Sequence, residues 1–209
     1  MAAISQTAFF PMKMGALKKA VQKIVKIEDM NQKLIQLRNL ATHNMSQIPP
    51  ILYQHALKSD FESVVVLMHC CDHSDPATQD QFIGYFTEIS NTNQFVDKIA
   101  AFCFYQLGCL HSSKHDFESA ISFFERALAY ETSFTPNMKI KAQIALGELY
   151  QSVQRYDEAA VSYRDAAFFL LSANKHNAAA KYFAAANACE KMFETRVDLD
   201  DEKDSCKTM

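Results

Sequence analysis

The chain has 209 residues, of which 49% are hydrophobic and 22% charged, enough for a domain with a buried core. Its formal net charge of −3 argues against general binding to nucleic acid, because such binding needs a basic surface that displaces counterions from phosphates. Only four Gly and five Pro interrupt the chain, whereas a β-protein of this length needs many more turn residues. We therefore predict an all-α protein.

The sequence also contains no recognisable membrane or export segment. No stretch holds the roughly eighteen consecutive apolar residues that a membrane span requires. A run of only three consecutive apolar residues comes directly before Pro11, which is too short for the apolar region of a signal peptide. The six cysteines follow no regular framework, so we interpret them as free thiols in a reducing compartment. We expect a soluble, cytoplasmic protein that uses no cofactor.

Residues 13–44 predict one long basic amphipathic helix, preceded by a flexible N-terminus over residues 1–12. Apolar residues recur every three or four positions, as one stripe of a helix requires. They are Leu17, Val21, Ile24, Ile27, Met30, Leu34, Leu37 and Ala41. Between Lys13 and Arg38 there are seven basic residues and two acidic ones. We interpret this helix as packing its stripe on the fold with its lysines in solvent. Contact of residues 13–44 with an anionic membrane or a protein partner is the alternative.

Residues 45–95 predict degenerate helical hairpins. A short helix over residues 51–57 leads into a predicted capping box formed by Ser59 and Glu62. The sequence at 75–76, Asp followed by Pro, predicts a new helix with an N-cap and a proline in its first turn.

Two later segments repeat one another: "FYQLGCLHSSKHDFESAISFFERAL" and "QIALGELYQSVQRYDEAAVSYRDAA". Both contain Leu-Gly, then an aromatic residue, Ala, a second aromatic residue and Ala at matching offsets. These positions are Leu107, Gly108, Phe117, Ala120, Phe124 and Ala127, and then Leu146, Gly147, Tyr156, Ala159, Tyr163 and Ala166. Small residues let facing helices approach closely, and the aromatic residues fill the space beside them. We therefore predict antiparallel helical hairpins.

This pattern resembles the tetratricopeptide repeat, a helix–turn–helix unit of about 34 residues. The resemblance implies TPR-like hairpin repeats over residues 96–193, and hence an all-α solenoid, to which the apolar periodicity of residues 13–44 adds a long N-terminal helix. It also implies a non-catalytic adaptor or chaperone-like module that binds a peptide or helix of a partner protein in a concave groove. By position in the repeats, the groove is expected to include Phe102, Tyr105, Cys109, Ser112, Lys141, Ile144, Glu148 and Gln151. The oligomeric state is left open.

Two other functions remain as alternatives. The run "SYRDAAFFLLSANKHNAAAKYFAAANA" resembles the soluble attachment proteins of membrane fusion in composition. A peripheral membrane-trafficking factor would use the basic helix over residues 13–44 on lipid. The second alternative is a metal-dependent enzyme at His69–His73, because two His one turn apart can share a transition metal.

Elsewhere the chain has no glycine-rich phosphate loop, no Gly-x-Ser-x-Gly elbow and no His-Glu-x-x-His, so we predict that it is not an enzyme. Cys103 and Cys109 are six residues apart on one predicted helix and face different directions, and we interpret them and the nearby His111 and His115 as hairpin packing rather than metal ligands. The last residues, 194–209, carry six acidic and three basic side chains and little apolar surface, so we predict an acidic disordered tail.

Overall fold

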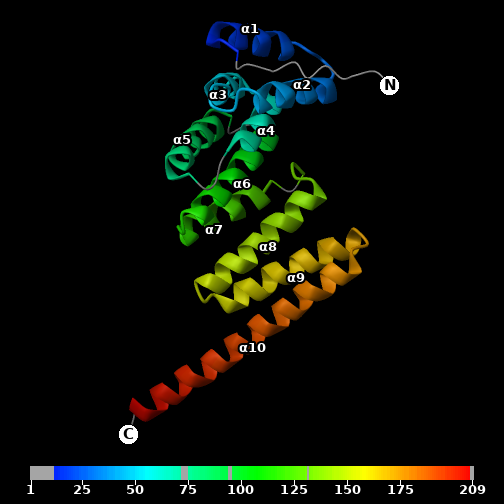
Figure 1. Ribbon diagram of the computed structural model, residues 1–209. Helices are drawn as coiled ribbons and strands as arrows, with labels where there is room; N and C mark the ends of the chain where they lie inside the picture. The colour runs from blue at the N-terminus through cyan, green and yellow to red at the C-terminus, as the bar shows by residue number, and fades with distance from the viewer. Residues whose placement is uncertain (1–11, 72–74, 94–95, 131, 208–209) are drawn as a thin grey trace, which may run out of the picture. The chain divides into compact units, whose positions relative to one another are not determined.

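The computed structural model of the protein describes residues 12–71, 75–93, 96–130 and 132–207, with side chains as far as residue 196. Within these residues the chain forms ten α-helices and no strand (Figure 1), which confirms the all-α prediction. The helices are α1 (Met14–Ile24), α2 (Met30–Thr42), α3 (Pro49–Ala56), α4 (Phe61–Cys70), α5 (Pro76–Thr92), α6 (Asp97–Ser113), α7 (Phe117–Leu128), α8 (Pro136–Ser152), α9 (Tyr156–Ser172) and α10 (His176–Lys207).

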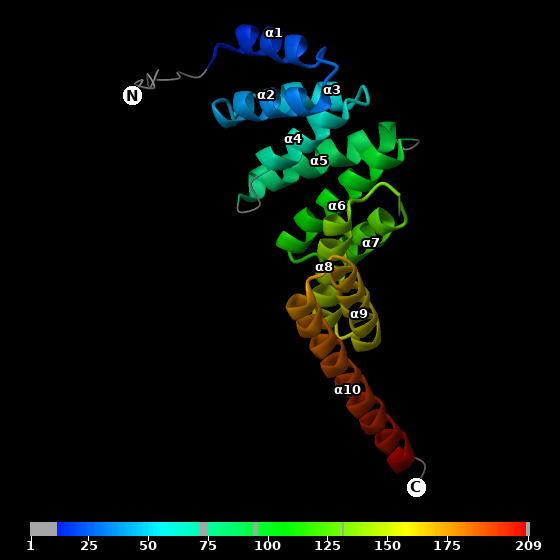
Figure 2. The same cartoon turned by 90° about the vertical axis from the view of Figure 1, so that its right-hand side faces the viewer.

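The helices fall into two compact units, divided within α6 between Cys103 and Phe104. In the first unit, α1 packs against α2 and α3, α2 packs against α4, and α3 packs against both α4 and α5 (Figure 2). In the second unit, α7 packs against α8, α8 against α9, and α9 against α10. In these pairs each helix packs on the next helix in the sequence or on the one after it, as expected for helical repeats.

The prediction of one long N-terminal helix is wrong. The helix ends at Ile24, and α2 begins at Met30 after a short connection. The carboxylate of Asp29 accepts a hydrogen bond from the backbone N–H of Gln32 at 2.6 Å, so Asp29 is the N-cap of a new helix. An apolar stripe of helical period continues across this connection, which explains why periodicity alone predicted one element.

The predicted capping box at Ser59 and Glu62 is also wrong in its register. Ser59 has a φ of +63° and lies outside the helix. The N-cap of α4 is Asp60, whose carboxylate accepts a hydrogen bond from the backbone N–H of Ser63 at 3.2 Å. Asp60 and Glu62 also form an ion pair with Lys33 of α2, and the Lys33 residue is only 8% exposed. The acidic residues at the start of α4 therefore hold α2 in place.

The repeat interpretation agrees with the packing of the second unit. Ala120 and Ala159 are fully buried in one hydrophobic cluster that includes Phe124 and Tyr163. A Cβ at Gly108 would lie 2.9 Å from the Phe124 ring, and one at Gly147 would lie 2.6 Å from the Tyr163 ring. The glycine of each Leu-Gly pair thus makes room for the aromatic residue of the following helix.

Four of the hairpin turns share one backbone geometry. Ser59, His115, Gln154 and Asn174 each have a φ between +56° and +63°. In each turn the next residue donates its N–H to a carbonyl five residues earlier, at distances from 2.8 to 3.3 Å. This pattern is the Schellman motif, which satisfies the last carbonyls of a helix before the next helix begins.

The predicted disordered tail is helical as far as the structure describes it, because α10 continues through Lys207. Nothing in the sequence from 176 to 207 interrupts a helix: this range contains neither Gly nor Pro. The charge of the tail argued for disorder, but helix-compatible residues extend a helix that α9 already supports.

Candidate functional site

The cysteines and histidines near the α6–α7 turn have structural roles. His111 Nδ1 lies 2.8 Å from the carboxylate of Asp116, which is also the N-cap of α7. The hydrogen bond from His111 is the main reason that the pKa of Asp116 lies below its usual value. The ring of His115 packs edge-on against Phe117. Cys103 is fully buried. These contacts stabilise the hairpin, and among the residues that the structure describes no three His, Cys, Asp or Glu side chains are grouped as metal ligands.

The His69–His73 hypothesis is tested only in part, since His73 lies outside the described residues. Nε2 of His69 lies 2.8 Å from the guanidinium of Arg38. Burial, and to a lesser extent the charge of Arg38, lower the pKa of His69. The two residues line a cleft of about 340 Å³ between α2 and α4, together with Met45 and Val66. The guanidinium, a hydrogen-bond donor, occupies the position where a cation would approach this nitrogen.

In the second unit the structure brings three of the predicted groove residues together. Tyr105 and Cys109 lie one turn apart on α6, and each side chain acts on the pKa of the other. Burial raises the pKa of Cys109 to about 11, while the charge of Lys141 on α8 acts in the opposite direction. Lys141 is therefore close enough to Cys109 to act on it electrostatically. The half-buried side chains of Tyr105 and Cys109 on α6 therefore lie near the exposed Lys141 on α8.

Tyr105 is less exposed than a surface anchor is expected to be. Its ring packs edge-on against Phe124 at 5.6 Å and against Phe134 at 6.1 Å, measured between ring centroids. The residue is half-buried against the core cluster of the second unit. Burial also raises the pKa of its hydroxyl. Tyr105 therefore belongs partly to the core, and its removal would affect packing as well as any surface function.

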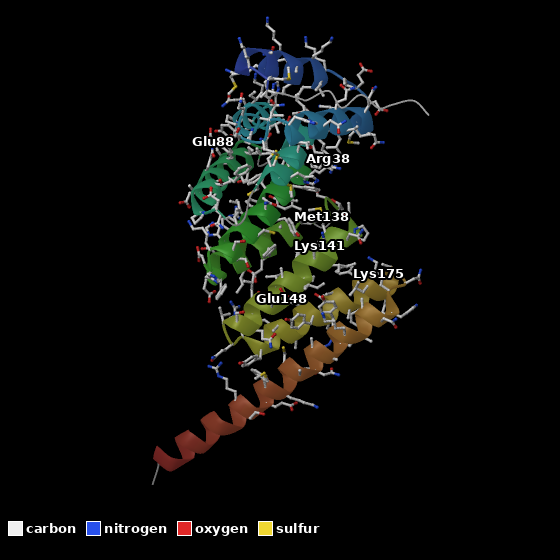
Figure 3. All side chains as sticks on the ribbon, in the orientation of Figure 1. Arg38, Glu88, Met138, Lys141, Glu148 and Lys175 are labelled. Carbon is white, nitrogen blue, oxygen red and sulfur yellow. The ribbon has the colours of Figure 1, made fainter. Side chains whose placement is uncertain are left out.

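The predicted groove residues of α8 form a single row along the helix. Lys141, Ile144, Glu148 and Gln151 follow one another at intervals of three or four residues, which places them on one face. Lys141, Glu148 and Gln151 are exposed, and Figure 3 shows the first two along α8. Ile144 is half-buried against the cluster formed by residues of α8, α9 and α10.

Tyr163 of α9 contacts the C-terminal end of this row. Its hydroxyl donates a hydrogen bond to Oε1 of Gln151 at 3.2 Å. Burial, with a smaller contribution from the nearby charge of Glu148, raises the pKa of Tyr163 to about 12. The Gln151 side chain is thus held by a core residue of the next helix, whereas Glu148 acts on that residue only through its charge.

Two predicted groove residues remain outside this description. Phe102 lies in the first unit, where its ring packs edge-on against Phe61 at 4.9 Å. Ser112 is half-buried in the last turn of α6.

The predicted groove left out α10, although the predicted repeats extended to residue 193. Tyr182 stacks on Tyr163 with a centroid distance of 6.0 Å and packs against both clusters of the second unit. Phe183 is half-buried beside it and follows Ile144 by 39 residues, the interval that also separates Leu107 from Leu146. That interval was the available signal: the repeat continues into α10, so the next helix also presents aromatic residues.

The N-terminal helix uses its apolar stripe within the fold. Leu17 and Val21 of α1 are fully buried, whereas Lys18, Lys19 and Lys23 are exposed. No helix among the described residues has the length and apolar character that crossing a membrane requires.

Comparison with known proteins gives one family match and several similar structures. A family model described as "Tetratricopeptide repeat" matches residues 103–133. No curated protein matches the sequence.

Three of the similar solved structures are of MamA proteins. One is 17% identical with a TM-score of 0.40 and covers 85% of this chain and 92% of its own. A second is 18% identical with a TM-score of 0.43 and covers 81% and 98%. A MamA RS-1 ArsTM double mutant is 15% identical with a TM-score of 0.41 and covers 88% and 97%. The family match and the helix packing lead to one conclusion: residues 103–133 are a tetratricopeptide repeat within an all-α chain of paired helices.

Proposed function

We propose that the protein is a non-catalytic interaction module that binds a peptide or helix of a partner protein on α6 and α8 of the second unit. The observation that carries the proposal is the half-buried Tyr105–Cys109 pair beside the exposed Lys141, within and next to a tetratricopeptide repeat. Partly exposed aromatic and apolar groups supply desolvation energy on contact, and the adjacent charges supply orientation.

The charges on α8 specify the kind of partner. Lys141 and Glu148 are seven residues apart, about 10 Å along a helix, and carry opposite charges. A partner segment with an acidic residue opposite Lys141 and a basic residue opposite Glu148 would bind in one direction only. Between the two charges, Ile144 is half-buried and favours an apolar side chain on the partner.

The membrane-trafficking alternative is less well supported by the structure. A basic amphipathic helix binds lipid by inserting its apolar face below the headgroups. In α1 that face is formed by Leu17 and Val21, which are already fully buried in the protein. Insertion would require α1 to leave α2 and α3, whereas binding on α6 and α8 requires no rearrangement.

The test is a comparison of partner recovery by charge-reversal variants. We expect the double variant Lys141→Glu/Glu148→Lys to lose the proteins that the natural chain recovers in affinity purification with mass spectrometry. Both side chains are exposed, so its melting temperature should change little. Lys175→Glu, at an exposed position in the α9–α10 turn, is the matched control and should retain those proteins. Equal recovery by all three chains would overturn the proposal, and loss of binding to liposomes on removal of residues 13–44 would favour the alternative.

A further inference from the structure

A cleft of about 500 Å³ lies in the first unit, and none of its lining residues belongs to the helices that carry the proposed function. It is bordered by α1, α3 and α5, of which α3 contacts both of the others. The lining residues that matter here are Met14, Lys18, Ile51, Tyr53, Lys58 and Tyr85. Neither the predicted groove nor the tetratricopeptide repeat at residues 103–133 includes any of them.

One wall of this α1/α3/α5 cleft is a fixed aromatic surface. Tyr53 of α3 and Tyr85 of α5 stack with a centroid distance of 4.3 Å and an interplanar angle of 20°. The hydroxyl of Tyr53 donates a hydrogen bond to Glu88 of α5, and the amide of Gln81 donates one to the hydroxyl of Tyr85 at 2.8 Å. Figure 3 marks Glu88. Hydrogen bonds hold both rings in place, so a ligand that packs on them would lose little of the rings' conformational entropy in binding.

The remaining lining is apolar and cationic. Met14 is 42% exposed although it borders the cleft, and Ile51 lies at its base with 6% exposure. Lys18 and Lys58 are exposed and form no ion pair with any residue that the structure describes. His55 also lines the cleft, but burial lowers its pKa and so disfavours its charged form, and no Asp or Glu lines the cleft.

The nearby carboxylates are already engaged by other groups. Glu88 accepts the hydrogen bond from Tyr53. Asp60 and Glu62 form the buried ion pair with Lys33. None of these three carboxylates forms an ion pair with Lys18 or Lys58, so both lysines are able to pair with carboxylates of a ligand in the apolar and aromatic cleft.

We propose that this cleft binds an acidic peptide segment of a partner protein, one in which an apolar or aromatic side chain is flanked by Asp or Glu. The central side chain would pack on Tyr53, Tyr85 and Ile51, and the flanking carboxylates would meet Lys18 and Lys58. The positive charges of Lys18 and Lys58 favour an acidic ligand. Residues 1–12 of the chain contain no Asp or Glu, so the protein's own N-terminal segment does not match the two lysines.

A peptide array tests the proposal on the full-length protein. The array holds peptides in which Leu, Phe or Tyr is flanked by Asp and Glu, with counterparts in which Asn and Gln replace the acids. The best binder is then measured by fluorescence anisotropy. We expect the acidic peptide to bind more tightly than its amide counterpart, and the difference to shrink as salt concentration rises.

Two double variants of equal charge change locate the site. Lys18→Glu/Lys58→Glu should weaken binding by about tenfold or more. Lys19→Glu/Lys23→Glu reverses two exposed lysines of α1 that do not line the cleft, and should weaken it much less. Lys141→Glu should leave binding unchanged, so failure here is distinguishable from failure of the proposed function. Equal losses in both double variants, or no preference for acidic peptides, would overturn the proposal. So would stronger binding after deletion of residues 1–11, because that segment would then be the natural occupant.

Discussion

Replacing Gly147 by Ala tests the packing of the repeat most directly. A Cβ at this position would lie 2.6 Å from two atoms of the Tyr163 ring and 2.9 Å from its Cγ. Cγ lies close to the backbone of α9, so the ring cannot avoid the methyl group by a small rotation at its tip. Either Tyr163 leaves its position or α8 and α9 move apart.

The two opposing energies can be compared. Ala is preferred over Gly within a helix by about 0.8–1.0 kcal/mol. Overpacking a core costs about 1–3 kcal/mol. Displacing Tyr163 also removes its hydrogen bond to Gln151, worth about 1 kcal/mol, and its stacking on Tyr182, worth about 0.5–1.5 kcal/mol. These contributions overlap, so we expect a net loss of about 2 kcal/mol, which lowers the melting temperature of a chain of this size by about 4–8 °C.

The assay is thermal or urea unfolding followed by circular dichroism, with two companion variants. Gly84 lies within α5, and a Cβ there would meet nothing within 4 Å. Gly84→Ala should therefore stabilise the protein by up to about 1 kcal/mol. The change in stability caused by Gly108→Ala should lie between those of the other two variants, because the nearest contact of a Cβ at this position, with Phe124, is 2.9 Å. The reasoning is refuted if Gly147→Ala stabilises the protein as Gly84→Ala does.

Three further predictions concern the second unit. Ala120→Leu or Ala159→Leu should each lower the free energy of unfolding by about 1–3 kcal/mol, since both sites are fully buried; an unchanged urea midpoint in both would show that the repeat alignment is incorrect. Gln154→Gly should raise the melting temperature more than Asn174→Gly, because Gly removes the cost of a positive φ and Asn tolerates that conformation better than Gln; the reverse order would contradict the turn assignment. Deleting residues 197–209 should leave cooperative unfolding intact, as measured by calorimetry, since the contacts of α10 with the core clusters involve residues 178–189.

The local elements were predictable because their signals are local. The helices α6 to α9 follow from apolar periodicity together with caps such as Thr135–Pro136, and the structure places the N-cap of α8 at Thr135. The interruption before α2 was missed because the connecting residues continue the apolar period. Only the hydrogen bond from Gln32 to Asp29 marks it, and a residue capable of capping does not reveal whether it caps.

The candidate sites were less predictable because they depend on residues far apart in the sequence. Tyr105 is covered in part by Phe134, which lies beyond α7 in the connection to α8. The cleft in the first unit combines Lys18 with Tyr85, residues that no local pattern associates. Residue type and spacing were enough to predict which residues share one face of α8. The burial of each side chain and the balance of charges around it could be determined only from the packed structure.

Tyr105 and Tyr163 explain why charge reversal is a sharper test of binding than removal of an aromatic residue. Both rings pack against or in the core cluster of the second unit. Tyr105 also lies beside Cys109, and Tyr163 donates a hydrogen bond to Gln151, on the surface proposed to bind a partner. Truncating either would therefore lower stability and change the surface at once. The exposed charges of Lys141 and Glu148 carry no core contact, so a change in partner recovery on their reversal must come from the surface itself.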